Sequence, residues 1–343
     1  MALSCARAAP LWVAAALCVV ALGCGAEHEA DPGGPGTSNP LAHAVALSLH
    51  AVLRHPDEGF LAQLSSGRDT VFLPLDACQA WVVTATLEHQ PATQPTARDL
   101  FLAMSDSLAV SLDHLLLDVA ADGLPTALLY LRVGSERRTL DAACSDALAI
   151  AQRSSAPLLG TPGLMDAFGR TGGTSGWPAS GVAAERSEAA AAALAPAQEE
   201  RVAMRFLGLA DQQVDVAVVL VDAQDQTVLP VFVNYCQAEA IYAGLHDPQS
   251  PAARRHGLLR DLASLAQAEV AAATIVDLVD ASYFGTVEVR TPRGLVPLNA
   301  RPSDALALAA LTHAPVYVAA HVLQSAGEQA APYLEFFAAE TGQ

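Results

Sequence analysis

The sequence contains no lysine. All 18 of its basic residues are arginine, and they stand against 36 aspartates and glutamates. The resulting net charge of −18 repels polyanions on average, so nonspecific binding of nucleic acid through a broad basic face is disfavoured. A nucleic-acid substrate would need a local arginine patch or bridging metal ions.

Several catalytic signatures are also missing. The sequence has no glycine-rich phosphate loop, no G-x-S-x-G nucleophile elbow and no H-E-x-x-H zinc motif. None of its six cysteines shows metal-ligand spacing such as C-x-x-C. These absences argue against a P-loop nucleotide hydrolase, an α/β-hydrolase and a zinc protease.

The sequence also lacks an apolar run long enough to span a bilayer, which takes about 20 residues. The shorter apolar run 11–22 predicts a signal peptide over residues 1–24. Ala21-Leu22-Gly23-Cys24 resembles a bacterial lipoprotein box, which implies a lipid on Cys24 and a membrane-anchored protein of the cell envelope, facing the periplasm or the exterior. The alternative is ordinary cleavage after the small residues, which would release a soluble periplasmic protein.

Three cysteines remain beyond the predicted signal peptide: Cys78, Cys144 and Cys236. An oxidising compartment permits a disulfide between Cys78 and Cys144. The alternative is that each is a small buried apolar residue.

Two parts of the chain repeat each other. Cys78-Gln79-Ala80 recurs as Cys236-Gln237-Ala238, and Ser145-Asp146-Ala147-Leu148-Ala149 recurs as Ser303-Asp304-Ala305-Leu306-Ala307, each 158 residues later. Several matches at one spacing indicate a duplicated domain. We expect the two copies to pack on each other as a pseudo-twofold pair.

The duplication and the composition together divide the chain. The expected parts are a signal peptide at 1–24, a flexible tether at 25–40, a first domain at 41–168, a low-complexity linker at 169–198, a second domain at 199–325 and a C-terminal helical extension at 326–343.

The second copy shows the pattern of elements more clearly. Alternating or β-branched apolar residues predict strands at 204–209, 214–221, 228–233, 274–278, 283–290, 295–298 and 316–318. Helices are predicted at 238–245, around Leu258, Leu259, Leu262 and Leu265, and at 304–311. This order predicts an α+β domain in which helices pack on a mixed sheet.

The second copy resembles the bifunctional nuclease family, or BFN domain. The resemblance rests on Leu229-Pro230-Val231, Glu239-Ala240-Ile241, His256-Gly257-Leu258-Leu259 and Arg301-Pro302-Ser303-Asp304-Ala305, and covers nearly all of residues 199–323. It implies a nuclease that acts on DNA and RNA. The first copy departs from the pattern, because Trp81 stands at the position of Glu239 and Ala143 at that of Arg301. Any phosphodiester chemistry is therefore expected in the second copy.

Phosphodiester hydrolysis needs charge neutralisation on the phosphate and activation of a water molecule. The candidate catalytic residues are Glu239, His256, Arg301 and Asp304, with Glu239 and Asp304 as candidate ligands for Mg²⁺ or Mn²⁺. Structural roles are the alternative. Ser303 could be a helix N-cap, Asp304 could favour the positive helix end, Arg301 could pair with a carboxylate, and His256 could open a helix as a polar cap.

Two functions therefore compete at this stage. The first is an envelope-located nuclease with nucleic acid as its partner. The second is a binding or scaffold protein in which the duplicated fold has lost catalysis. Gly257, which stands where the family pattern has an aspartate, favours the second function.

Overall fold

We analysed a computed structural model of the chain, which describes residues 41, 43–67, 69–88, 94–170, 200–211 and 215–341. The predicted signal peptide, Cys24, the tether and most of the predicted linker lie outside the described residues. Within the described part of the chain, no helix is both long and apolar enough to cross a membrane.

The first copy folds into nine strands and four helices within its described residues. They are β1 Val45–Ala46, β2 Ser48–His55, β3 Gly59–Ser65, β4 Thr70–Leu75, α1 Ala77–Leu87, α2 Ala97–Ser107, β5 Val110–Val119, β6 Pro125–Val133, β7 Glu136–Ala142, α3 Cys144–Ser154, β8 Leu158–Gly160, α4 Pro162–Phe168 and β9 Gly169–Arg170.

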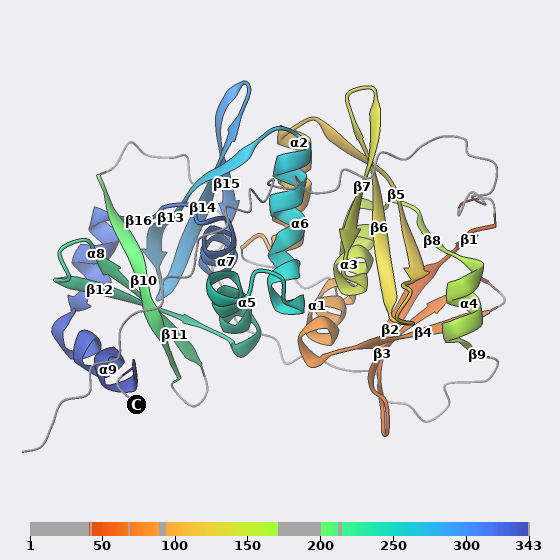
Figure 1. Cartoon of the computed structure of the whole chain (residues 1–343), viewed down its shortest axis with the longest axis horizontal. Helices are drawn as coiled ribbons and strands as arrows, with labels where there is room; N and C mark the ends of the chain where they lie inside the picture. The colour runs from red at the N-terminus through yellow and green to blue at the C-terminus, as the bar shows by residue number, and fades with distance from the viewer. Residues whose placement is uncertain are drawn as a thin grey trace, which may run out of the picture. The chain divides into compact units, whose positions relative to one another are not determined.

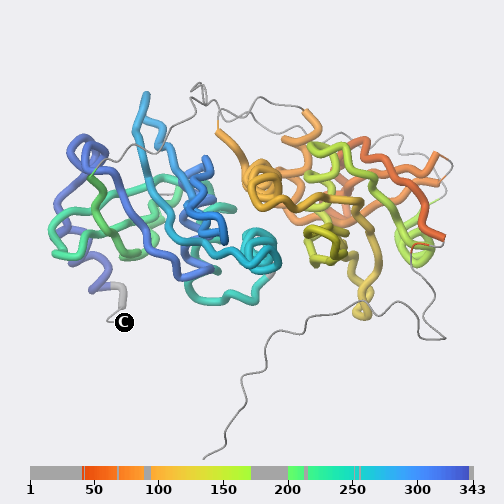
Figure 2. Tube along the Cα trace, turned by 90° about the horizontal axis from the view of Figure 1, so that it is seen from above, coloured from red at the N-terminus to blue at the C-terminus, as the bar shows by residue number. Residues whose placement is uncertain are grey.

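The second copy repeats this order, except that the single strand β10 replaces β1 and β2, and it ends with one additional helix (Figure 1). Its elements are β10 Arg201–Asp211, β11 Val216–Asp222, β12 Thr227–Val233, α5 Tyr235–His246, α6 Pro251–Leu265, β13 Glu269–Val279, β14 Ser282–Thr291, β15 Gly294–Ala300, α7 Pro302–Thr312, β16 Val316–Ala319, α8 Ala320–Ala326, β17 Glu328–Gln329 and α9 Ala331–Thr341. Figure 2 shows that each copy is built from one continuous stretch of chain, the first in red to yellow-green and the second in green to blue.

Helices begin where side chains satisfy the free backbone N–H groups of the first turn. Asp76 and Gln79 form a capping box at the start of α1, and Asn234 and Gln237 form the equivalent box at the start of α5. These boxes place the start of α5 three residues before the predicted start at 238.

The sheets confirm the predicted mixed α+β fold. In the second copy one sheet has the order β15-β14-β13-β16-β10-β11-β12-β17, with antiparallel neighbours except for the parallel pair β13 and β16. The parallel pair β5 and β8 of the first copy has the same register, because Leu115 faces Leu158 there and Ala273 faces Val316 in the second copy.

The first copy differs in one respect. Its strands form two sheets, β1-β8-β5-β6-β7 and β2-β3-β4-β9, because the first strand is interrupted at Leu47. The corresponding strand of the second copy, β10, is continuous and joins both halves into one sheet.

Two predicted boundaries are wrong by a few residues. The linker was expected to begin at 169, but Gly169 and Arg170 form β9, which pairs with β4. The C-terminal extension was expected to be helical from 326, but β17 first pairs with β12, and helix α9 follows. In each case a two-residue strand closes the edge of a sheet, a signal too short to recognise from composition.

Contacts between the copies are reciprocal. Helix α2 contacts α6, α2 also contacts β15, and α6 contacts β7, the counterpart of β15. The Gln94 side-chain amide adds a hydrogen bond of 2.8 Å to the Tyr283 carbonyl. Reciprocal contacts of equivalent elements are what a pseudo-twofold pair requires, and we keep that arrangement as a proposal.

The disulfide in the structure is not the one that the sequence analysis considered. Cys78 pairs with Cys236, not with Cys144, across a sequence separation of 158 residues. The two sulfurs come from equivalent positions of α1 and α5, which meet where the copies face each other. Cys144 is a free, buried thiol, as the alternative expected for it. Burial, and then the charge of Asp146, raise the pKa of the Cys144 thiol to about 12, so it is inert at neutral pH.

Candidate functional site

The N-terminus of α7 carries two of the predicted site residues. Arg301 is the N-cap residue and Pro302 occupies the first helical position, where its missing N–H costs nothing. The prediction that Ser303 caps this helix is therefore wrong, since the helix begins two residues earlier. Asp304 lies in the first turn, as predicted, where a negative charge is favourable.

Three of the four predicted catalytic residues meet at this helix start. Arg301 Nε donates to Asp304 Oδ2 at 2.8 Å, and Arg301 Nη2 donates to Asp304 Oδ1 at 3.3 Å. His256 Nε2, from helix α6, lies 3.1 Å from Asp304 Oδ1. The structure therefore brings Arg301, His256 and Asp304 into one network, which we call the Asp304 network.

The Asp304 network is largely closed to solvent. Asp304 is 3% exposed and His256 is 7% exposed, while the Arg301 side chain keeps 18% of its surface. Arg301 is therefore the member of the network that remains accessible to a ligand.

Electrostatics keep Asp304 ionised. Burial alone would raise the pKa of Asp304, but the charge of Arg301 and the hydrogen bond and charge of His256 outweigh it and hold this pKa well below its usual range. A carboxylate can only accept hydrogen bonds, so His256 Nε2 carries the proton of their shared bond. The other ring nitrogen, Nδ1, is buried without a hydrogen-bond partner.

The first copy contains a reduced version of this network. Asp146, equivalent to Asp304, is buried and paired with the guanidinium of Arg98, which replaces His256. Ala143 stands where Arg301 would be, and the Asp146 Oδ2 atom is buried without a partner. Both copies thus pair this buried aspartate with a basic side chain from the preceding helix, and only the second copy adds an arginine at the helix start.

Glu239 belongs to helix α5, not to the helices that carry the Asp304 network. It is half-buried on α5, and its Oε2 atom lies 4.0 Å from Cys78 Sγ of the first copy. Helix α5 packs against both α6 and α7, so the four predicted residues lie on three mutually packed helices (Figure 1).

The described residues do not fit a resident metal ion. Among them, no group of three or more histidines, cysteines, aspartates or glutamates is arranged to hold one. Both oxygens of Asp304 already accept hydrogen bonds from Arg301 and His256. A metal at Asp304 would have to displace both side chains, so the predicted Mg²⁺ or Mn²⁺ site remains a prediction without geometric support.

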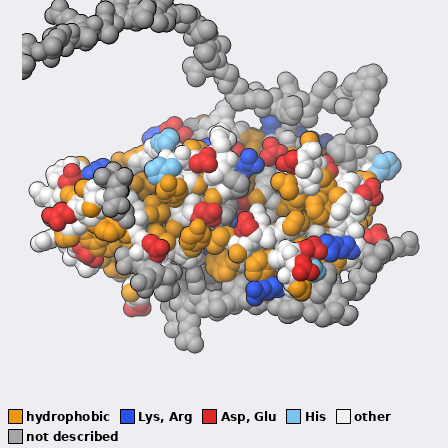
Figure 3. Space-filling view, turned by 60° about the horizontal axis from the view of Figure 1, so that its bottom comes forward, with side chains coloured by type: hydrophobic (Ala, Val, Ile, Leu, Met, Phe, Trp, Pro, Cys, Tyr) orange, Lys and Arg blue, Asp and Glu red, His pale blue; other side chains and the backbone are white. Residues whose placement is uncertain are grey.

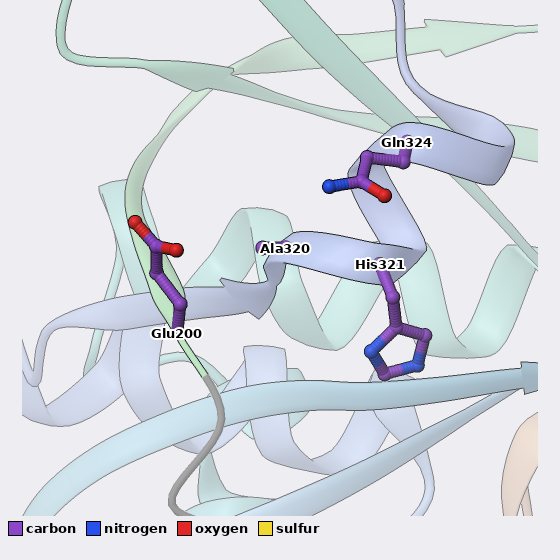
Figure 4. A pocket seen from close by; sticks show the side chains of 4 residues that line it. All are labelled: Glu200, Ala320, His321 and Gln324. Carbon is purple, nitrogen blue, oxygen red and sulfur yellow. The ribbon is translucent and has the colours of Figure 1, made fainter.

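A shallow hollow lies elsewhere in the second copy. Glu200, Ala320, His321 and Gln324 line it, around the start of α8 (Figure 4). His321 Nε2 lies 3.2 Å from Asp277 Oδ1. The hollow contains none of the residues predicted to be catalytic.

The sequence-based prediction missed the pairing of Arg98 with Asp146 in the first copy. Its signal was present, since Arg98 stands 158 residues before His256 and 48 before Asp146, the spacing that also separates His256 from Asp304. Cys78 was missed as a neighbour of Glu239 for a related reason, because the repeat predicts equivalent positions within each copy and leaves open which residues of the two copies touch.

Comparison with known proteins gives one match in each of the two copies. Residues 60–171 and residues 218–331 each match the bifunctional nuclease domain. Two curated relatives from Mycobacterium tuberculosis, the uncharacterized protein MT1877 of strain CDC 1551 / Oshkosh and the uncharacterized protein Rv1829 of strain ATCC 25618 / H37Rv, are each 29% identical to this chain over 106 residues. The matched segment is 31% of this chain and 63% of each relative, so it spans less than two thirds of their length. The two matches cover most of the described chain, which therefore belongs to the bifunctional nuclease domain family and carries that domain twice.

Proposed function

We propose that this protein is a nuclease that hydrolyses phosphodiester bonds of DNA or RNA, with its site in the second copy. The observation that carries the proposal is the Asp304 network, which stands in a bifunctional nuclease domain and keeps a partly accessible arginine. The first copy has lost that arginine.

The residues of the second copy divide into two roles in this proposal. Arg301 neutralises the phosphate, since a guanidinium presents several donors to phosphate oxygens in a fixed fork. Glu239 accepts a proton from the attacking water, because it is the candidate carboxylate that is not closed off by burial. Asp304 and His256 are positioning residues that hold the Arg301 side chain at the helix start.

A specific observation favours a second candidate function, a binding or scaffold protein without catalysis. Asp304 is almost completely buried and its oxygens are occupied by Arg301 and His256. Such a network can serve folding alone. The two functions differ in what Arg301 does, so a substitution at Arg301 separates them.

We also propose a location for this activity. The lipoprotein-box resemblance at Cys24 supports an anchored envelope protein, for which nucleic acid outside the cytoplasm is the available substrate.

The purified chain is expected to cleave end-labelled single-stranded DNA or RNA. Cleavage is measured on gels in EDTA, in Mg²⁺ and in Mn²⁺. Replacing Arg301 with alanine is expected to lower the cleavage rate by at least about ten-fold, because one charge-assisted phosphate contact is lost. Arg290→Ala is the matched control, since Arg290 is an exposed arginine paired with Glu269.

Arg290→Ala is expected to cleave at the unsubstituted rate. Each variant is compared at temperatures where circular dichroism shows it folded. A wild-type chain without activity in any of the three buffers would support the scaffold function. Equal cleavage by Arg301→Ala and the unsubstituted chain would contradict the assigned site.

A further inference from the structure

The exposed face of helix α5 is formed by four residues. Tyr235, Glu239, Tyr242 and His246 follow one another at spacings of four, three and four residues, which places them in one narrow arc of an α-helix. Ala238, Ala240, Ile241, Ala243 and Gly244 occupy the rest of the circumference and are buried. The outward face of α5 therefore consists of two tyrosines with a carboxylate between them and an imidazole at the end.

The two tyrosines are unusually open for aromatic residues. Tyr235 is 73% exposed and Tyr242 is 56% exposed, and Phe232, just before α5, is 59% exposed. Large aromatic side chains contribute most where they bury surface against a partner. Figure 3, in which the lower side of Figure 1 comes forward, shows apolar side chains exposed at several places among charged and polar ones.

An arginine stands in the first turn of the neighbouring helix α6. Ala243 of α5 packs with Ala252 and Ala253 in the first turn of α6. Arg254 follows directly, is exposed, and makes no ion pair with any described residue. His246, whose ring contacts the Tyr242 ring at 4.5 Å between centroids, lies in the last turn of α5. The helix that packs next to α5 thus offers an exposed guanidinium to a polyanion, despite the acidic chain as a whole.

We propose that the exposed face of α5 binds single-stranded nucleic acid, with bases stacked on Tyr235 and Tyr242. The proposal rests on the proposed nuclease function and names its substrate class. Seven residues of helix separate the two rings by about 10 Å along the axis, room for roughly three stacked nucleotides. A strand held in this way passes Glu239, the proposed base, midway between its two anchors.

Stacking on exposed tyrosines favours a single-stranded over a double-stranded substrate. In a duplex the base faces are stacked on one another and closed to protein side chains, whereas an unpaired base offers its face to an aromatic ring. Stacking on tyrosine also tolerates any base and either sugar, as an enzyme acting on both DNA and RNA requires. A protein partner could also use exposed tyrosines, and the binding experiment distinguishes it.

Binding is measured separately from cleavage. A fluorescein-labelled 12-nucleotide single strand is titrated with the full chain carrying Glu239→Gln, and anisotropy reports binding. Adding Tyr235→Ala or Tyr242→Ala is expected to weaken binding about ten-fold each, because each substitution removes one stacking surface. Tyr→Phe at either position keeps the ring and is expected to retain binding. Phe336→Ala, which removes an exposed aromatic residue of α9, is the matched control.

The outcomes separate this inference from the nuclease proposal. Tyrosine-dependent binding by a chain that never cleaves would support the α5 face and defeat the nuclease function. Suppose that neither alanine substitution changes binding by the Glu239→Gln chain or cleavage by a chain that keeps Glu239. That result would contradict binding at the α5 face and leave the nuclease function standing. Equal affinity for duplex and single strand, or no nucleic-acid binding at all, would overturn the inference, and the latter result would favour a protein partner.

Discussion

Replacing Asp304 with alanine is expected to lower the free energy of unfolding by about 3–5 kcal/mol, because it leaves Arg301 and His256 at a buried site without the carboxylate that they share. The Asp304 side chain is 4% exposed and accepts hydrogen bonds from Arg301 and His256. Urea unfolding followed by circular dichroism measures the change. Glu269→Ala is the matched control: the Glu269 side chain is 67% exposed, and loss of its pair with Arg290 should cost less than about 1 kcal/mol.

The stabilisation by Asp304 should also depend on pH. The pKa of Asp304 is lower in the folded protein than its ordinary value near 4, so its contribution is fully present above that ordinary value and is lost as the pH falls toward the folded pKa. The stability difference between the unsubstituted chain and Asp304→Asn should therefore narrow between about pH 5 and pH 2. A difference that stays constant over this range would contradict a salt-bridged, ionised Asp304.

Removal of the Cys78–Cys236 disulfide is expected to have a comparable effect. The bond closes a loop of 158 residues, and the chain-entropy account gives roughly 5 kcal/mol of stabilisation for a loop of that size. The Cys78→Ser/Cys236→Ser double variant should lose most of that free energy of unfolding.

The control for the disulfide is to compare the effect of a reductant on the unsubstituted chain and on the double variant. Dithiothreitol should destabilise the unsubstituted chain and leave the double variant unchanged. Peptide mapping without reduction should recover Cys78 joined to Cys236, with Cys144 as a free thiol. A peptide joining Cys78 to Cys144, or three free thiols in the folded, unreduced chain, would contradict the pairing of α1 with α5 across the two copies.

The fold was largely predictable because its strands and helices have strong periodic patterns. The strand predicted at 228–233 and the helix predicted at 304–311 match β12 and α7 to within two residues. The ends of other elements were missed where polar or small residues begin the element, as at Asn234 before α5. Helix α8 was missed because its seven residues have no capping side chain and only one buried residue.

The site was predictable in its composition but only partly in its geometry. A repeated Ser-Asp-Ala motif identified Asp304, and resemblance supplied Arg301 and His256 as candidates. The burial and pairing of Asp304 could not be predicted from the sequence, because they depend on which helices pack against each other. The pairing of Asp146 with Arg98, and of Asp304 with His256, links residues 48 positions apart.

The disulfide shows what the repeat itself implied. Equivalent residues near a twofold axis meet each other, so a cysteine at the same position of both copies is a candidate for pairing across that axis. Cys78 and Cys236 are such a pair, whereas Cys144 has Pro302 as its counterpart. Spacing along the chain alone gave no reason to prefer this pair over a bond within the first copy.

We propose that phosphodiester chemistry belongs to the second copy alone. It is tested most directly by measuring the cleavage rate of an end-labelled single strand for two substitutions at equivalent positions, Glu239→Gln in the second copy and Trp81→Phe in the first. We predict that Glu239→Gln reduces cleavage at least about a hundred-fold, as expected for loss of a general base, while Trp81→Phe cleaves normally. Undiminished cleavage by Glu239→Gln, at equal folded fraction, would contradict the account.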